Sequence, residues 1–517
     1  MKKKLVSVLL AATLSLSLMA CGAADSGTTT DSAKATEEQT AATGETDKSE
    51  QKNEEVVDIT LTFPILSSVP EDLQKVQDKL TEIAMEKYNC SITLEPLAFG
   101  DYISQAPLML TGGNDVDLMI HFDPITNYSS MVSKGQIQNI TDLLNEYAPD
   151  VLATVGEDYL AACRVDGQLY GVPTMHDLAT GYGVVMRRDL LEKYNIDVSG
   201  VKTLDDLDAV FEVIKENEPN IAPMFAGGAA MNPADAIMKA SVDTLGDGYG
   251  VLMDMGQSDT VTDYFETQEY TDYVNKVYEW NQKGYLLADS DSITDTYSTL
   301  FKADKIFAAF MTCKPGQVQQ DERNTGKDLA FVQISDTLSM TTLVNGIQWV
   351  IPVGAEHPDR AVQILNLLYT DADFLNLLNY GIEGEHYVVK DNGQIALPDG
   401  VTADTSKFNW SIGYESGNEF ICYTWESDDP DLWNQTKEFN DQAVKSSAMG
   451  FTFDNSNVST ELTALANVSA KYRVGLENGT LDPKEYAGKF VEELKNAGLD
   501  TVIAEKQKQL DEWKANK

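Results

Sequence analysis

Two aromatic side chains and an acid lie close together in the last fifth of the chain. Tyr423 and Trp425 share one face if this segment is extended, and Glu426 follows directly. A sugar offers C–H faces for aromatic stacking and hydroxyls for polar side chains, so a sugar site combines Trp or Tyr with acids, amides or lysine. The segment is a candidate carbohydrate-binding site; the alternative is that its rings cover a lobe surface.

The same mixture follows a short buried-strand pattern that ends at Ile120. His121 and Asp123 can hydrogen-bond to hydroxyls, and Phe122 can stack on a sugar ring. Asp123 precedes Pro124, so it could instead cap a turn or a helix. We favour the ligand-binding interpretation.

Tyr182, Lys314 and Trp349 are further candidates, because each lies in or directly after a strand pattern. Tyr182 can stack on a sugar, and His176 and Asp177 precede it. Lys314 could equally be a solvated lysine and His176 a surface histidine. Trp349 could lie in the cleft or in the core, since its indole N–H needs a partner in either place.

No motif for catalysis is present in the sequence. It contains no G-x-S-x-G elbow, no H-E-x-x-H and no P-loop, and its four histidines are scattered. With 82 acids, some carboxylate pair will resemble a glycosidase pair by chance. The run from Asp289 to Asp295 resembles a calcium loop, but it has Thr294 at the sixth position and Leu300 at the twelfth. We expect no enzymatic activity, no metal and no other cofactor.

The first 21 residues predict a bacterial lipoprotein signal. A charged start at Lys2–Lys4 precedes the apolar stretch Leu5–Ala20, which ends in small residues before Cys21. This stretch is short for a membrane span, which needs ~20 residues. Cys21 is the expected lipid-attachment residue, and the alternatives are an uncleaved anchor or a chance cysteine. Residues 22–55 have almost no bulky apolar side chains and predict a disordered tether.

The chain is strongly acidic, with 38 Lys and Arg against 82 Asp and Glu and a formal net charge of −44. This charge argues against nucleic acid as a partner, because phosphate binding needs Lys and Arg. It also argues against docking on anionic lipid through a basic patch.

Four cysteines remain besides Cys21, and they are far apart in the sequence: Cys90, Cys163, Cys313 and Cys422. Their spacing excludes a metal knuckle or a C-x-x-C motif. Disulfides and buried free thiols are both open.

The folded body alternates strands and helices. Residues 57–63 predict a strand, 73–88 a helix and 91–99 a second strand. A helix after Asp101 should end near Gly112-Gly113, before a buried strand at 117–121. This order predicts a mainly parallel sheet with helices on its faces.

Later segments repeat this pattern. Thr203–Asp206 resembles a capping box that opens a helix to Asn217. Leu499, Ile503 and Leu510 fall on one helical face, so the C-terminal helix should dock on the body. Further strands are expected at 170–174, 182–187, 306–312 and 346–353.

Several motifs resemble a known family in their order. The lipoprotein signal and the segments Asp115–Ile120, Gly167–Pro173 and Met186–Tyr194 resemble the extracellular solute-binding proteins of ABC importers, which include maltose-type sugar binders. The second half, at 379–387, 431–453 and 503–513, resembles the LplA-type lipoproteins with a DUF3502 C-terminal region.

The resemblance implies an α/β fold of the periplasmic-binding-protein type (type II), with two interwoven lobes joined by a hinge and a ligand cleft between them. Lobe 1 would hold residues 56–175 and 336–378, and lobe 2 residues 176–335 and 379–517. In this family the loop at His121–Asp123 and the position of Lys314 reach the cleft.

The implied protein is a monomer, lipid-anchored on the extracytoplasmic face of the cell membrane. It would capture a carbohydrate, an oligosaccharide, and deliver it to the permease subunits of an ABC transporter. The alternative function is a surface polysaccharide-processing enzyme or an adhesion module, and turnover of an oligosaccharide would indicate the enzyme.

Overall fold

The structure is a computed structural model that describes residues 56–111, 115–123, 125–228, 237–238, 240–403 and 405–516. The chain separates into two units, Met1–Asn53 and Glu54–Lys517, and the described residues belong to the second. The predicted lipoprotein signal with Cys21, the tether at 22–55 and the helix stop at Gly112-Gly113 lie outside the described residues. Within those residues, no helix has both the length and the apolar composition that a membrane crossing requires.

A five-stranded sheet has the order β2-β1-β3-β14-β6. Its strands are β1 (Val57–Ile65), β2 (Cys90–Ala98), β3 (Leu118–Phe122), β6 (Gly171–Pro173) and β14 (Ile347–Val350). β1 is parallel to β2 and β3, so the parallel arrangement expected from residues 57–121 is confirmed. β14 is antiparallel to both β3 and β6. β3 and β6 therefore run in the same direction and end at the same edge of the sheet.

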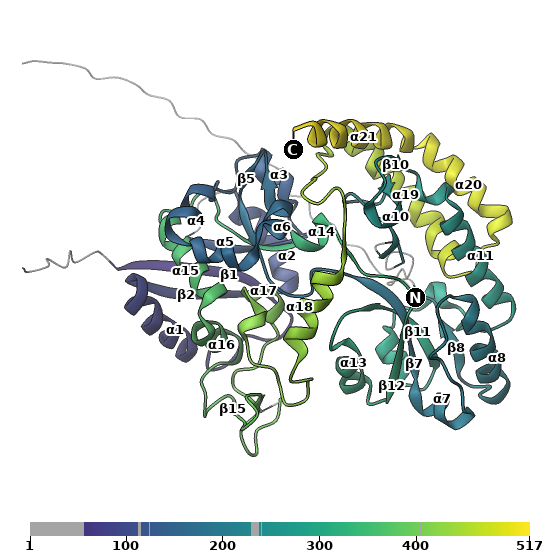
Figure 1. Cartoon of the computed structure of the whole chain (residues 1–517), viewed down its shortest axis with the longest axis horizontal. Helices are drawn as coiled ribbons and strands as arrows, with labels where there is room; N and C mark the ends of the chain where they lie inside the picture. The colour runs from purple at the N-terminus through teal and green to yellow at the C-terminus, as the bar shows by residue number, and fades with distance from the viewer. Residues whose placement is uncertain are drawn as a thin grey trace, which may run out of the picture. The chain divides into compact units, whose positions relative to one another are not determined.

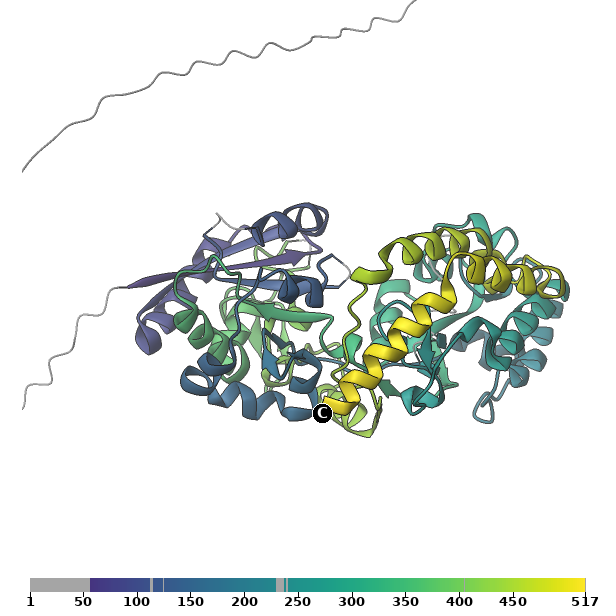
Figure 2. The same cartoon turned by 90° about the horizontal axis from the view of Figure 1, so that it is seen from above.

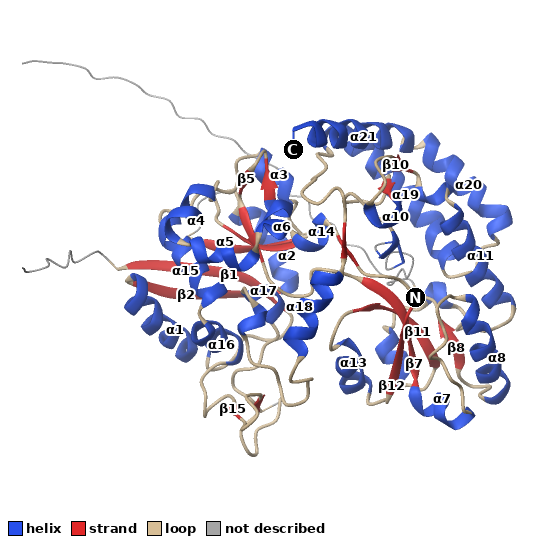
Figure 3. Cartoon of the chain, in the orientation of Figure 1, coloured by secondary structure: helices blue, strands red, loops and turns tan. Residues whose placement is uncertain are grey.

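A second, four-stranded sheet has the order β12-β7-β11-β8 (Figure 3). It contains β7 (Gly181–Arg187), β8 (Ala222–Phe225), β11 (Ile306–Cys313) and β12 (Leu329–Gln333). β7 is antiparallel to β11 and β12, and β11 is parallel to β8. The strands expected at 182–187 and 306–312 are confirmed, and Lys314 follows β11 directly.

Amphipathic helices cover the first sheet (Figure 1). α1 (Leu73–Tyr88) buries Val76, Leu80 and Ala84, which are four residues apart and share one helical face. α1 contacts α16 (Ala372–Tyr380), and α15 (Pro358–Thr370) contacts α4 (Thr141–Tyr147) and α5 (Pro149–Val155). These helices and β1 share one hydrophobic core.

The C-terminal helices pack with the second sheet. α19 (Ser459–Glu477) and α20 (Pro483–Asn496) both contact α11 (Gln268–Gln282), and α21 (Leu499–Asn516) follows them (Figures 1 and 2). α21 buries Leu499, Val502, Lys506 and Leu510. The expected docking of the C-terminal helix is confirmed. The core that it joins also contains residues of β7 and β11.

The chain passes between the two sheets three times. The crossings lie between β6 and β7, between β12 and β14, and between α18 (Leu432–Gln442) and α19. The short strands β13 (Leu338–Ser339) and β17 (Val444–Lys445) pair in two of these crossings, and Thr180 of the third bridges to Leu338.

One predicted boundary differs from the packing. Residues 379–517 were expected to form part of the second lobe. Phe408, Trp410 and Cys422 instead pack in the core of the first sheet. Residues from Ala448 onward join the core of the second sheet, apart from Met449, which packs with the first. The chain therefore leaves the core of the first sheet and enters that of the second near the third crossing, after α18, and not directly after α16.

All four cysteines of the described body are buried free thiols. Burial raises the pKa of Cys90 and of Cys313 to about 11. Of the two alternatives left open by the sequence, the structure has the free thiols.

Candidate functional site

A cavity of ≈ 290 Å³ combines aromatic and charged side chains. We call it the aromatic cavity. Its lining includes Lys314, Tyr423 and Trp425, so the structure brings three of the predicted site residues together. Its other aromatic residues are Tyr380, Trp410, Tyr414 and Trp433, and its other charged residues are Asp177, Arg323, Glu419 and Asp428.

Neighbouring groups hold the aromatic wall in place. The rings of Trp425 and Tyr380 meet edge to face with centroids 5.7 Å apart, and the Tyr380 hydroxyl donates to the carbonyl oxygen of Tyr423 at 2.8 Å. Trp410 Nε1 donates to the carbonyl oxygen of Leu378 at 2.9 Å. Trp425 is half-buried, and its Nε1 forms no hydrogen bond within the part of the chain that the structure describes. This wall can therefore present both a ring face and a donor to a ligand.

An ion pair forms the polar side of the aromatic cavity. Lys314 Nζ donates to Asp177 Oδ1 at 3.1 Å, and His176 Nδ1 lies 3.5 Å from the same oxygen. Burial alone would raise the pKa of Asp177, but the hydrogen bond from His176 and the charge of Lys314 outweigh it and lower this pKa to about 2. Asp177 is therefore an ionised acceptor at neutral pH. A second pair, Arg323 Nη1 to Asp428 Oδ1 at 2.7 Å, lies in the same lining.

Glu419 is a functional candidate that the sequence did not reveal. Burial raises its pKa to about 7, the neighbouring carboxylates of Asp177 and Asp428 add to this, and His176 and Lys314 oppose it. No sequence motif marks this residue, because its properties depend on groups far away in the chain. Trp410 and Trp433 also line the aromatic cavity, and neither was among the site residues predicted from the sequence.

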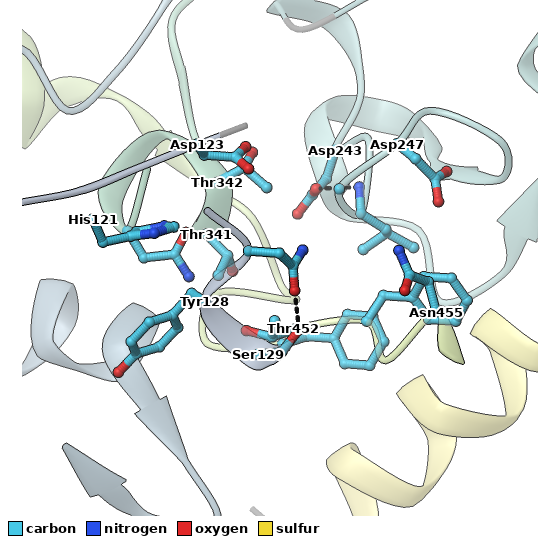
Figure 4. A pocket seen from close by; sticks show the side chains of 16 residues that line it. His121, Asp123, Tyr128, Ser129, Asp243, Asp247, Thr341, Thr342, Thr452 and Asn455 are labelled. Carbon is cyan, nitrogen blue, oxygen red and sulfur yellow. Dashed lines mark hydrogen bonds between the residues drawn. The ribbon is translucent and has the colours of Figure 1, made fainter. Parts of the chain in front are cut away.

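A second cavity of ≈ 170 Å³, here called the polar cavity, contains His121 and Asp123 (Figure 4). His121 Nδ1 lies 2.7 Å from Thr126 Oγ1, and burial lowers the pKa of His121 to about 3, so its ring is neutral. Phe122 does not line this cavity and packs edge to face on Phe99 at 5.6 Å.

The other two predicted site residues lie elsewhere. Trp349 is a core residue, 1% exposed, with its Nε1 donating to the carbonyl oxygen of Ser416 at 3.3 Å. Its side chain cannot reach a ligand in this structure, because it projects into the core on one face of the sheet, where Phe63 and the backbone of Ser416 contact it. Tyr182 is buried against Phe310 and lines a third cavity of ≈ 300 Å³ together with Tyr264.

Asp72, Glu385 and His386 are close enough to hold a metal ion within the described residues. The backbone N–H of Ile382 donates to His386 Nδ1 at 2.8 Å, so the ring proton is on Nε2, which lies 3.1 Å from Asp72 Oδ2. Nε2 thus has no lone pair for a metal, and a metal-binding histidine would instead donate from its other nitrogen. Glu385 pairs with Lys75. The three residues form a structural cluster of ion pair and hydrogen bonds.

Comparison with known proteins assigns the class of this fold. Residues 67–373 match the family described as bacterial extracellular solute-binding protein, and the chain belongs to that family. Residues 447–515 match a domain of unknown function, DUF3502. The predicted family, its C-terminal region and the periplasmic-binding-protein type of fold are thereby confirmed.

Proteins from Streptococcus pneumoniae are among those similar to this chain. A carbohydrate ABC transporter substrate-binding protein of serotype 4 is 27% identical over 455 residues, covering 87% of this chain and 89% of that protein. The crystal structure of the N-glycan transport solute-binding protein NgtS has a TM-score of 0.76 at 24% identity, covering 88% of this chain and 98% of that one. NgtS in complex with Man5GlcNAc has a TM-score of 0.66 at 24% identity, covering 89% and 99%.

Proposed function

We propose that this protein is the substrate-binding component of an ABC importer and that it binds an oligosaccharide in the aromatic cavity. The observation that carries the proposal is the pairing of half-buried rings, Trp425 and Tyr423, with the ionised acceptor Asp177 in one lining. The relative from S. pneumoniae is named for carbohydrate, and NgtS was solved with a glycan, which supports the same ligand class.

The chemistry of the lining fits a neutral, hydroxyl-rich ligand. Aromatic faces stack on the C–H faces of a sugar, and carboxylates accept hydrogen bonds from its hydroxyls. The charges of the lining are largely paired with each other, as in Asp177–Lys314 and Arg323–Asp428, so a strongly charged ligand would have to break these pairs.

Binding alone is sufficient for this role, and we propose that the protein performs no chemistry on its ligand. A ligand that contacts residues on both sides of a cavity favours a closed arrangement over an open one. The three crossings between the sheets are the proposed hinge. The proposed lobes hold residues 56–175, 336–378 and about 379–442 on one side, with the remainder on the other.

The location is proposed from the N-terminal sequence. The lipoprotein signal places a lipid on Cys21, and residues 22–55 tether the folded body to the extracytoplasmic face of the membrane, where it acts as a monomer beside its permease. Mass spectrometry of the protein extracted from membranes should show a chain that begins at Cys21 and carries acyl groups on that residue, whereas Cys90 should carry none. A Cys21 without acyl groups would show that the lipid anchor is wrong.

Calorimetric titration with Man5GlcNAc and the shorter Man1GlcNAc tests the ligand. We expect both glycans to bind, and each to raise the melting temperature; ligand at 100 times its Kd adds about 2.7 kcal/mol. Trp425→Ala should weaken the binding of both glycans. Tyr194→Ala, which removes a half-buried tyrosine outside the described cavities, should not change the binding of either glycan. Chromatography of the incubated glycans should show no product.

Two results would contradict the proposal. Unchanged affinity in Trp425→Ala would place the ligand elsewhere. Binding of peptides but of no glycan would exclude the carbohydrate, and glycan turnover would support an enzyme.

A further inference from the structure

We propose that the polar cavity is a second carbohydrate subsite, which takes hydroxyls at the far end of a long glycan whose other end lies in the aromatic cavity. The C-terminal region 447–515, which matches a domain of unknown function, forms one wall of this subsite. The inference rests on the proposed function, because it assigns a second contact to the same ligand.

An unpartnered carboxylate oxygen faces the polar cavity. Asp243 is 2% exposed, and its Oδ1 accepts the N–H of Leu245 at 2.9 Å. Its Oδ2 is buried and has no hydrogen-bond partner within the described residues. Asp243 and Asp123 both line this cavity (Figure 4). A buried acceptor without a partner is costly, so a donor from a ligand would be strongly favoured here.

A second unpartnered atom lies in the same lining. Thr452 Oγ1 is buried and has no partner within the described part of the chain. Leu245, also in the lining, has a left-handed backbone with φ 47°, which is uncommon for a bulky residue and concentrates at binding sites.

Some polar groups of the cavity are already used within the protein. The Thr341 hydroxyl donates to the carbonyl oxygen of Ala448 at 3.1 Å, and Asn345 Nδ2 donates to that of Ala162 at 3.0 Å. Other lining residues, such as Thr342 and Asn455, can add polar contacts. Within the described residues, the buried unpartnered side-chain atoms of this lining are Asp243 Oδ2 and Thr452 Oγ1, and together they suit a ligand hydroxyl.

Helix α21 fixes both loops that carry these two residues. Lys506 Nζ donates to Asp247 Oδ1 at 2.5 Å and to the carbonyl oxygen of Gly250 at 3.1 Å, which holds the loop after Asp243. Gln509 accepts from the N–H of Asp454 at 3.0 Å and donates to its carbonyl oxygen at 2.9 Å, which holds the loop after Thr452. The C-terminal region thus positions the subsite.

The sheet places the two cavities near each other. Asp123 directly follows β3, and Asp177 lies shortly after β6. These parallel strands end at the same edge and are separated only by β14, so their ends are roughly 10 Å apart. A glycan of several residues can therefore occupy both cavities at once, whereas a disaccharide seated in the aromatic cavity has no further residue to place in the polar cavity.

Calorimetry with two glycan lengths tests the inference. Asp243→Asn keeps the acceptor for Leu245 but replaces the free carboxylate oxygen. We expect it to weaken Man5GlcNAc binding roughly tenfold, the loss expected when the hydrogen bond to a buried oxygen is removed. Man1GlcNAc contacts only the aromatic cavity and serves as the internal reference. Trp425→Ala is the matched variant that should weaken both.

Thr452→Val is the second variant, because the Thr452 hydroxyl has no partner among the described residues and its removal should not lower the unliganded melting temperature. It should also weaken only the longer glycan. If neither polar-cavity variant changes Man5GlcNAc affinity, or if both glycans weaken equally, the subsite is wrong. If Trp425→Ala still weakens both glycans, the proposed function stands without it; if wild type binds no glycan, both fail.

Discussion

Lys506 is completely buried and ion-paired to Asp247, whose side chain remains 25% exposed. The ammonium group also lies over the ring of Phe453, 5.2 Å from its centroid. Burial lowers the pKa of Lys506, and the charge of Asp247 opposes this shift. The two partners thus differ in one respect: water can reach the acid and not the lysine.

This difference predicts unequal costs for the two single substitutions. Asp247→Asn leaves a buried ammonium without its counter-ion and should lower the free energy of unfolding by about 3–5 kcal/mol. Lys506→Met preserves the packing and leaves an acid that water can solvate, so it should cost less. Urea unfolding of both variants measures the difference.

Lys514→Met is the matched control, because Lys514 lies on the same helix as Lys506 and pairs with Asp259 at 2.5 Å, but both side chains of this pair are accessible. It should change stability by about 1 kcal/mol or less. If Lys506→Met costs as much as Asp247→Asn, the asymmetry argued from burial is wrong.

Trp349 should matter for stability and not for ligand recognition. Its ring packs in the core beside Phe63, with centroids 6.3 Å apart. Trp349→Ala should destabilise the unliganded protein by about 3–5 kcal/mol, the usual cost of deleting a buried indole. Denaturant unfolding without glycan measures this, and Trp425→Ala, which removes a half-buried ring, should cost clearly less. Equal costs would contradict the assignment.

Glu419 should make stability depend on pH. Burial raises the pKa of this carboxyl from 4.5 to about 7, so the folded protein keeps a proton that the unfolded chain releases. The stability contributed by this proton is present below about pH 4.5 and is lost as the pH rises to about 7. Glu419→Gln cannot release this proton, so it does not lose stability as the pH rises. The difference between its melting temperature and that of wild type should therefore shift in its favour between pH 5 and pH 7.5. Parallel melting curves would exclude the shift.

The four body cysteines should resist alkylation in the folded state. Cys90, Cys163, Cys313 and Cys422 are buried, and burial raises their pKa values, which disfavours the reactive thiolate. Mass spectrometry after maleimide treatment should find these residues unmodified in native protein and modified after denaturation without reductant. Labelling that requires a reductant would instead indicate disulfides.

Much of the fold could be predicted from the sequence because its signals are local. The alternation in β1, the helical spacing of α1 and the apolar face of α21 each depend on a few neighbouring residues. The lobe boundary at 379 could not be predicted in the same way. It depends on Trp410 packing against Phe63 of β1 and on Cys422 joining the same core, and no local pattern reports such contacts.

The site was predictable only in part, for the same reason. Lys314 and Trp425 could be found because they follow strands or pair with aromatic residues. Trp349 has the same local appearance and is a core residue, because its burial depends on packing partners that are distant in the chain, such as Phe63 and Ser416. Burial raises the pKa values of Glu419 and Asp243, and groups distant in the chain modify them. The spacing of residues in the sequence does not reveal such effects.

The interleaved course of the chain also constrains the order in which the protein can be completed. The core of the second sheet contains both Tyr182 of β7 and Leu510 of α21. The apolar surface of β7 is therefore fully covered only when the last helix has packed on the core. Contacts so far apart in sequence form slowly and leave unfinished intermediates exposed. A chain that ends before α21 would therefore leave part of the apolar core of the second sheet uncovered.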